Sequence, residues 1–120
     1  DMFPMARHVQ IACDTAKGVV ARLAGVEIPK DEDTEKTLPE LKARIAKTIA
    51  FIQGFTPAQI DGTEDKAIVT KRGDKETHYK GMQFLLGHAV PNFYFHVATA
   101  YNILRHNGVE IGKRDYIGNP

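Results

Sequence analysis

The stretch KGMQFLLGHAVPNFYFHVATAYNILRH, residues 80–106, decides the fold of this protein. Hydrophobic residues recur in it at every third or fourth position, which is the spacing of one face of an α-helix. A helix over Lys80–His106 is therefore predicted, with Asn107-Gly108 as its stop. Its main hydrophobic stripe consists of Met82, Leu86, Ala89, Phe93, Val97, Ala100 and Leu104.

Further hydrophobic residues widen this stripe over most of the helix: Leu85, Tyr94, Phe95, Tyr101 and Ile103. A helix that is hydrophobic on several sides is normally covered on several sides. We therefore expect a central residue such as Phe93 to be buried. Pro91 lies inside the helix, where it lacks a backbone donor and clashes with the preceding turn, so a kink is predicted between Gly87 and Pro91.

Two more amphipathic helices are predicted earlier in the chain. The first covers Asp1–Ala24, with Asp1 as its N-cap and Gly25 as its stop. The second begins at Thr37, where Glu40 completes a capping box, and ends near Gly54. Their predicted buried stripes are Met5, Val9, Ala12, Ala16, Val19, Val20 and Leu23, and then Leu38, Leu41, Ile45, Ile49 and Ile52. The cations Lys42, Arg44 and Lys47 are assigned to the solvent side of the second helix.

The connecting segments are predicted to be short or exposed. Residues 26–36 contain Pro29 and an acidic cluster that lacks the glycine and the distal glutamate of an EF-hand, so we read them as an exposed connection rather than a calcium site. That cluster is Asp31, Glu32, Asp33 and Glu35. Residues 56–59 predict a single helical turn, and residues 67–79 predict a hairpin about Gly73.

These elements predict an all-α protein, a single domain over residues 1–120 with three helices and a short hairpin before the last helix. Two helices and a hairpin give thin cover for the wide hydrophobic surface of the last helix. We therefore expect either a further helix that precedes Asp1 or a partner subunit, and hence a homodimer.

The composition excludes several classes of protein. The chain has 120 residues and a net charge of +1, which predicts no binding to nucleic acid or to membrane surfaces. Its single cysteine, Cys13, excludes an intrachain disulfide and favours a cytoplasmic location. No segment has the length and hydrophobicity of a membrane span or a signal peptide. The chain begins with Asp1 rather than with methionine, so we expect it to be part of a longer polypeptide.

Several motifs resemble an uncharacterised bacterial family, the domain of unknown function nineteen ninety-three. The most specific is Pro91-Asn92-Phe93-Tyr94-Phe95-His96, a string that helix periodicity does not require. The segments at Met2-Phe3-Pro4, at Val9-Gln10-Ile11-Ala12 and at Gly112-Lys113-Arg114-Asp115-Tyr116 are also similar, so the resemblance covers essentially the whole chain.

The resemblance implies a fold like that of the DinB and YfiT group, an up-down four-helix bundle with a hairpin before the last helix. Relatives normally carry one more helix before Asp1. Many proteins of that group bind a divalent metal such as zinc or nickel through three histidines, and some act as transferases or hydrolases. Carried over by position, His96 matches the second histidine of the His-x-x-x-His pair, while Asn92 replaces the first.

The candidate site therefore lies along one edge of the last helix, where Asn92, His96 and Thr99 are neighbours. His8 on the first helix is placed to face His96. Because Asn92 is a poor ligand for zinc or nickel, we expect no metal, unless His88 turns inward and completes a set of His8, His88 and His96. Without a metal, His96 and Asn92 are expected to bond each other or a backbone carbonyl, or to edge a pocket for a small molecule.

Two functions remain open at this point. One is a binding or structural module with a pocket edged by His8, Asn92 and His96. The alternative is a metal-dependent transferase or hydrolase that uses a histidine-lined site. Cys13 is expected to be a buried thiol rather than a nucleophile.

Overall fold

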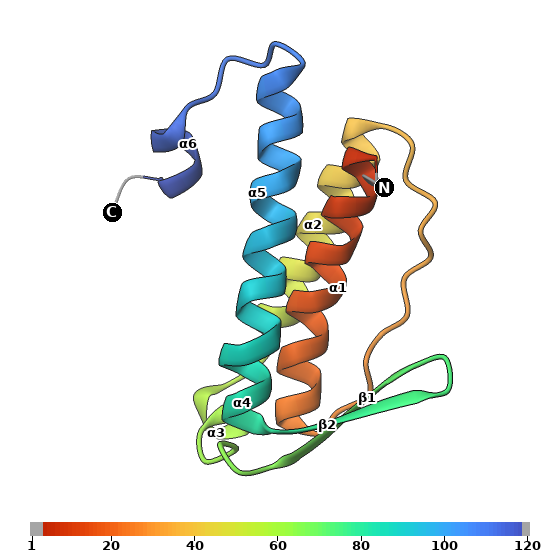
Figure 1. Ribbon diagram of the computed structural model, residues 1–120, viewed down its shortest axis with the longest axis vertical. Coiled ribbons are helices and arrows are strands. Elements are labelled where there is room, and N and C mark those ends of the chain that lie inside the picture. The colour runs from red at the N-terminus through yellow and green to blue at the C-terminus, as the bar shows by residue number, and fades with distance from the viewer. Residues whose placement is uncertain (1–3, 119–120) are drawn as a thin grey trace.

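A computed structural model describes residues 4–118 of the chain (Figure 1). Three long helices dominate it: α1 (Met5–Ala24), α2 (Leu38–Gln53) and α5 (Val90–His106). The short helices are α3 (Pro57–Ile60), α4 (Gly81–Phe84) and α6 (Lys113–Ile117), and the strands are β1 (Ala67–Arg72) and β2 (Lys75–Lys80). The expectation of a mainly helical fold with a hairpin before the last long helix is confirmed.

The order of helix directions differs from the predicted up-down pattern. In Figure 1, α1 and α2 run in the same direction and α5 runs against both. The cause is the segment 26–37, which we call the strap, because it returns along the full length of α1 before α2 begins. An extended chain of 12 residues reaches roughly 40 Å and a helix of 20 residues spans about 30 Å, so the strap is long enough for this return.

The ends of the helices follow local chemistry. The Thr37 hydroxyl accepts a hydrogen bond from the Glu40 amide, and the Glu40 carboxylate accepts one from the Thr37 amide, so the predicted capping box is confirmed. Gly25 ends α1 in the left-handed conformation, with φ of 74°. Helix α1 begins at Met5, and the predicted cap at Asp1 lies outside the described residues.

The last helix is not one regular α-helix. A π-helical turn, η1 (Leu85–Ala89), joins α4 to α5, and the Val90 amide donates to the Leu85 carbonyl five residues earlier. Where a kink was predicted, between Gly87 and Pro91, the structure has this wider turn. The proline ring would crowd the carbonyl of Gly87 in a regular helix, and a wider turn is one way in which helices relieve such crowding.

The hairpin pairs β1 with β2 in antiparallel register, from Ala67 opposite Lys80 to Arg72 opposite Lys75. Gly73, with φ of 62°, forms the first position of its two-residue turn. Gly81 follows the hairpin, and a Cβ atom there would lie 1.9 Å from the Thr63 carbonyl oxygen. Only glycine therefore allows the chain to pass Thr63 and enter α4 at this point.

The best-covered part of the core lies where the hairpin meets the end of α1. Leu23, Ile68, Phe84 and Ala89 are buried there and pack together. Between the long helices, by contrast, the predicted stripes are only partly covered. Phe93 is half-buried, so the prediction of a buried Phe93 is wrong. Large residues of the predicted stripes of the second and last helices are exposed, namely Leu38, Ile45, Ile49, Met82 and Leu86.

The orientation of α2 explains part of this difference. Leu41, Arg44 and Thr48 are its buried residues, so the side of α2 that meets α1 is partly polar. The assignment of Arg44 to the solvent side is wrong, because carboxylates of the strap and of α1 surround its guanidinium. Ile45 and Ile49 consequently lie beside the side of α2 that meets α1, where they are exposed.

Candidate functional site

A pair of buried histidines joins α1 to α5. His8 and His96 are 3% and 8% exposed, and their Nδ1 atoms lie 2.9 Å apart. The two ring centroids are 5.1 Å apart, and the Phe95 ring lies edge-on to His8 at 6.5 Å. The prediction that His8 faces His96 agrees with this geometry.

The distance between the two nitrogens is that of a hydrogen bond. An imidazole nitrogen donates only when it carries a proton, so one ring donates through Nδ1 and the other accepts. Burial lowers the pKa of His96, and the nearby His8 and Arg7 lower it further. The neutral form of His96 is therefore favoured, which matches a bond between two neutral rings.

Asn92 and Thr99 do not join this pair. The Asn92 amide donates to the Thr15 hydroxyl at 3.0 Å, and Thr15 in turn donates to the Ile11 carbonyl. The predicted bond between Asn92 and His96 is therefore replaced by one to Thr15, two helical turns along α1 from His8. Thr99 donates to the Phe95 carbonyl of its own helix.

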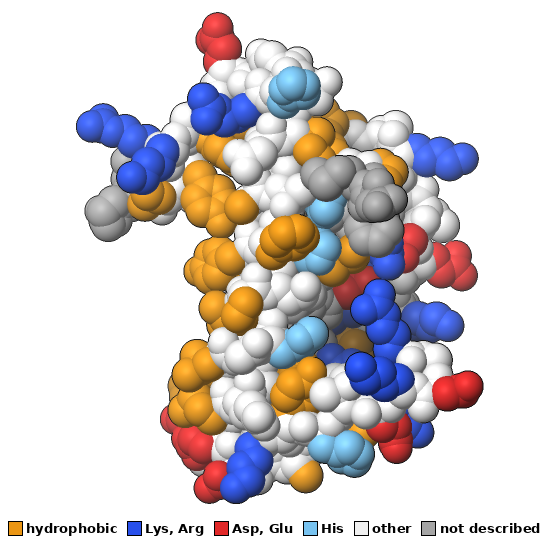
Figure 2. All heavy atoms as spheres, viewed as in Figure 1, with side chains coloured by type: hydrophobic (Ala, Val, Ile, Leu, Met, Phe, Trp, Pro, Cys, Tyr) orange, Lys and Arg blue, Asp and Glu red, His pale blue; other side chains and the backbone are white. Residues whose placement is uncertain are grey.

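His88 also lies apart from the pair. It is exposed and stacks on Phe84, with ring centroids 5.5 Å apart, and its ring lies 5.8 Å from that of Tyr79. The hairpin therefore holds His88 through Tyr79, and the π-helical turn does not direct it toward His8. Figure 2 shows histidine side chains at several levels of this face rather than in one cluster.

The donor set does not fit the three-histidine metal centre that the family resemblance implies. Within residues 4–118, no group of three His, Cys, Asp or Glu side chains is placed to hold a metal ion. Zinc and nickel sites in proteins need at least three strong nitrogen, sulfur or carboxylate ligands. His8 and His96 supply two, and the amide that replaces the third bonds Thr15.

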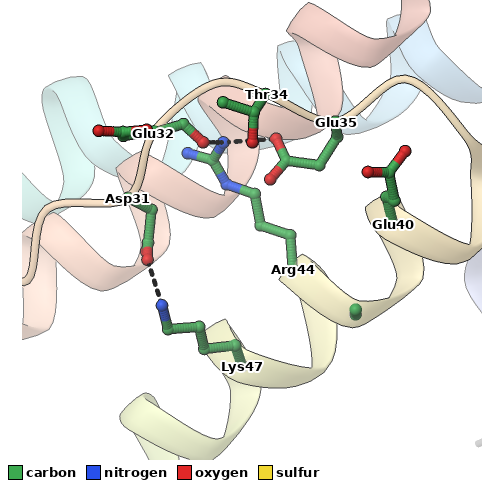
Figure 3. Close-up of a pocket in the computed structure, with 8 residues that line it drawn as sticks. Asp31, Glu32, Thr34, Glu35, Glu40, Arg44 and Lys47 are labelled. Atoms are coloured by element: carbon green, nitrogen blue, oxygen red, sulfur yellow. Dashed lines mark hydrogen bonds and ion pairs between the residues drawn. The ribbon is translucent and has the colours of Figure 1, made fainter.

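A second polar cluster lies beneath the strap (Figure 3). The Arg44 side chain is 3% exposed and bonds Asp14 at 2.8 Å, Asp33 at 2.7 Å and Glu35 at 2.8 Å. It also donates to the Glu32 carbonyl. Burial opposes the charge of Arg44, but these three carboxylates raise its pKa above the usual range. Arg44 therefore holds the strap across α1 and α2.

Asp31 is the other anchor of the strap. It accepts from Lys17 at 2.7 Å and from Lys47 at 2.6 Å, and Figure 3 shows the Lys47 ammonium directed at its carboxylate. These two bonds lower the pKa of Asp31 to about 2. Asp31, Asp33 and Glu35 of the acidic cluster are therefore paired with cations of α1 and α2, and these ion pairs fasten the strap.

An open apolar groove runs between α2 and α5, with α1 as its floor. Two adjoining cavities of about 380 Å³ and 250 Å³ form it, and they share Ala16, Ile52 and Phe93. Its remaining lining side chains are Val9, Ala12, Cys13, Thr15, Val19, Val20, Ile45, Thr48, Ile49, Ala89, Val90, Tyr94, Val97, Ala100, Tyr101 and Leu104. Nearly all are apolar, so the groove excludes charged ligands and offers a surface for an apolar one.

Cys13 lines this groove as a buried thiol. Burial raises its pKa, and the hydrogen bond with Thr48 and the charge of Arg44 only partly offset that effect. A thiol with a raised pKa is a poor nucleophile, in line with the prediction for this residue.

Comparisons with known proteins place this architecture in a class and a family. The class is the DinB-like helical proteins: a crystal structure of a DinB family member protein from Shewanella denitrificans matches with a TM-score of 0.92 and 48% sequence identity. The match covers 100% of this chain and 68% of that one. The family described as Domain of unknown function (DUF1993) matches residues 1–117, and the chain belongs to it. No curated protein matches the chain. Within the described residues, no helix is long and apolar enough to cross a membrane.

Proposed function

We propose that this chain is a binding and structural module whose apolar groove receives one amphipathic helix. The observation that carries the proposal is the groove itself, which three helices line along most of their length. Its lining residues on η1 and α5 extend from Ala89 to Leu104, which corresponds to roughly 22 Å of helix. A helix of four turns matches that length.

The packing of the long helices supports a helical occupant. Helix α1 packs against both α2 and α5, whereas α2 and α5 have little contact with each other and line opposite walls of the groove. Three helices so placed occupy three corners of a four-helix bundle, and the groove is the fourth corner. A fourth helix joined to the start of α1 by a short connection would run against α1. The completed bundle would then have two parallel pairs, α1 with α2 and the fourth helix with α5, instead of the strict alternation of an up-down bundle.

When the 120-residue chain is alone, we propose that a second copy covers the groove and forms a homodimer. Exposed apolar residues follow the outer side of α4, η1 and α5 at intervals of four: Met82, Leu86, Val90 and Tyr94. Figure 2 shows hydrophobic side chains along this edge of the molecule. An apolar surface that continues from the groove over its rim is typical of an interface between subunits.

The molecular mass in solution tests this proposal, with two isoleucine variants as a matched pair. Ile49 lines the groove and is 50% exposed, whereas Ile117 on α6 is 63% exposed and lies outside it. We expect a dimer for the natural sequence and for Ile117→Glu, and a monomer for Ile49→Glu, measured by light scattering after gel filtration. A stable monomer of the natural sequence would overturn the homodimer, and equal behaviour of both variants would remove the groove from the interface.

A metal-dependent transferase or hydrolase with His8, His88 and His96 is the second candidate. The observation in its favour is the meeting of two imidazole nitrogens in a buried position, in a chain with a DinB-like fold. Elemental analysis of untagged protein tests it. One zinc or nickel per chain, lost in both His8→Ala and His96→Ala, would make this candidate the leading one, and a metal content near zero would reject it.

A further inference from the structure

The distance between the His8 and His96 rings is that of a hydrogen bond. Two imidazole nitrogens that bind zinc at about 2.0–2.1 Å in tetrahedral geometry stand roughly 3.3 Å apart. The observed separation of the two Nδ1 atoms is 2.9 Å, which is the usual length of a hydrogen bond to nitrogen. The separation fits a hydrogen bond better than tetrahedral ligation, and for an octahedral ion the number of available ligands decides.

The surroundings of the pair also disfavour a cation. Arg7 precedes His8 on α1, and its guanidinium places a positive charge near His96. Arg7 is itself bound to Asp33 of the strap at 2.9 Å, so its own place is fixed. Among the described residues no third ligand stands nearby, because Asn92 bonds Thr15 and His88 stacks on Phe84.

Two polar contacts cross the interface between α1 and α5, His8 with His96 and Thr15 with Asn92. The helices run in opposite directions, so the first contact lies near the start of α1 and the second lies further along it. A slip of one helix past the other by a single turn breaks both contacts and leaves the buried imidazoles and the half-buried Asn92 amide without these partners. Such a slip is costly, because unpaired polar groups are poorly tolerated in a protein interior.

We infer that His8 and His96 share one proton in a neutral N–H···N hydrogen bond and do not form a metal centre. This bond and the bond between Asn92 and Thr15 set the register of α1 against α5. The donor ring carries its proton on Nδ1, whereas a histidine in water carries it mostly on Nε2. This inference does not rest on the proposed helix-binding groove, since neither His8 nor His96 lines it.

Nitrogen NMR of the histidine rings tests the inference on the intact natural chain. We expect one of His8 and His96 to be protonated on Nδ1 and the other to have an unprotonated Nδ1. We also expect addition of one equivalent of zinc to leave both rings unchanged. His78, which is exposed in β2, serves as the control for weak metal binding by a surface imidazole, through His78→Ala.

Two results would overturn the inference. One is protonation on Nε2 in both rings, because no proton would then lie between the two Nδ1 atoms. The other is saturable binding of one zinc per chain that shifts the His8 and His96 nitrogens together and persists in His78→Ala. The outcome is independent of the oligomeric state, so a failure here and a failure of the helix-binding proposal can be told apart.

Discussion

Replacement of Asp31 by asparagine tests the role of the strap in stability. Asp31 carries two short ion pairs, with Lys17 at 2.7 Å and with Lys47 at 2.6 Å, and its side chain is 12% exposed. The Lys17 side chain is only 6% exposed. Asp31→Asn therefore removes the negative charge beside the nearly buried Lys17 ammonium. Among the described residues, the remaining carboxylate within ion-pair distance of Lys17 is Asp14, at 3.4 Å.

The size of the effect follows from the pKa of Asp31. Folding lowers this pKa from its ordinary value of 3.8 to about 2. Each tenfold change in proton affinity is equivalent to about 1.4 kcal/mol, so the ionised carboxylate contributes roughly 2 kcal/mol to the free energy of unfolding at pH 7. Because the folded pKa is depressed, the contribution is complete above about pH 5 and is lost as the pH falls through 3.8 toward 2. About half of it remains at pH 3.

Urea denaturation followed by circular dichroism measures this contribution at pH 7, 5 and 3. We expect Asp31→Asn to lower the free energy of unfolding by roughly 2 kcal/mol at pH 7 and by about half as much at pH 3. Asp65→Asn is the control, because Asp65 is 90% exposed and 3.9 Å from Lys80, and we expect no measurable change there. A cost below about 0.5 kcal/mol at pH 7, or a cost that does not vary with pH, would refute the reasoning.

Three further predictions concern the core, a helix end and the thiol. Phe84→Ala should lower the free energy of unfolding by roughly 3–5 kcal/mol, because Phe84 is 3% exposed at the centre of the buried cluster. Phe93→Ala should lower it by less than half as much, because Phe93 is half-buried, and urea denaturation of both variants measures the difference. Thr37→Ala should cost about 1 kcal/mol in the same assay through loss of the capping box, and an unchanged free energy of unfolding would exclude that role. Cys13 should react with Ellman's reagent only after unfolding, because burial raises the pKa of its thiol, and rapid reaction of the folded chain would contradict this.

Local chemistry made the helix ends and the hairpin predictable. Thr37 and Glu40 form a capping box through a few neighbouring atoms, and Gly73 allows a tight turn whatever surrounds it. The irregularity before Pro91 was predictable for the same reason, since a proline removes a backbone donor in any helix. Only its form, a π-helical turn, depends on the rest of the fold.

The direction of α2 and the burial of Arg44 could not be read from periodicity. A connection of 12 residues is long enough for α2 to run either way, and the choice depends on ion pairs between residues far apart in the sequence, such as Asp14 with Arg44. A pattern of hydrophobic residues assigns an arginine to solvent unless its partners are known. The acidic cluster of the strap was the available signal, because four carboxylates in five residues need cations nearby if they lie on the protein surface.

The candidate site was predictable in part. The family resemblance and the helical period together placed His8 opposite His96, and the structure brings these two rings into contact. Asn92 was assigned to the same site because it lies one turn from His96. The offset between two antiparallel helices, which no pattern within one helix determines, carries Asn92 to Thr15 instead.

A crystal structure of the 120-residue chain is the most direct test of the central claim that the groove between α2 and α5 receives a helix. We expect a helix of a second copy to lie over Ala12 and Ala16, between Ile49 and Phe93. This helix would bury the apolar side chains that α2 and α5 contribute to the groove. A monomer whose groove is filled by solvent, with Ile45 and Ile49 in contact with water, would contradict it.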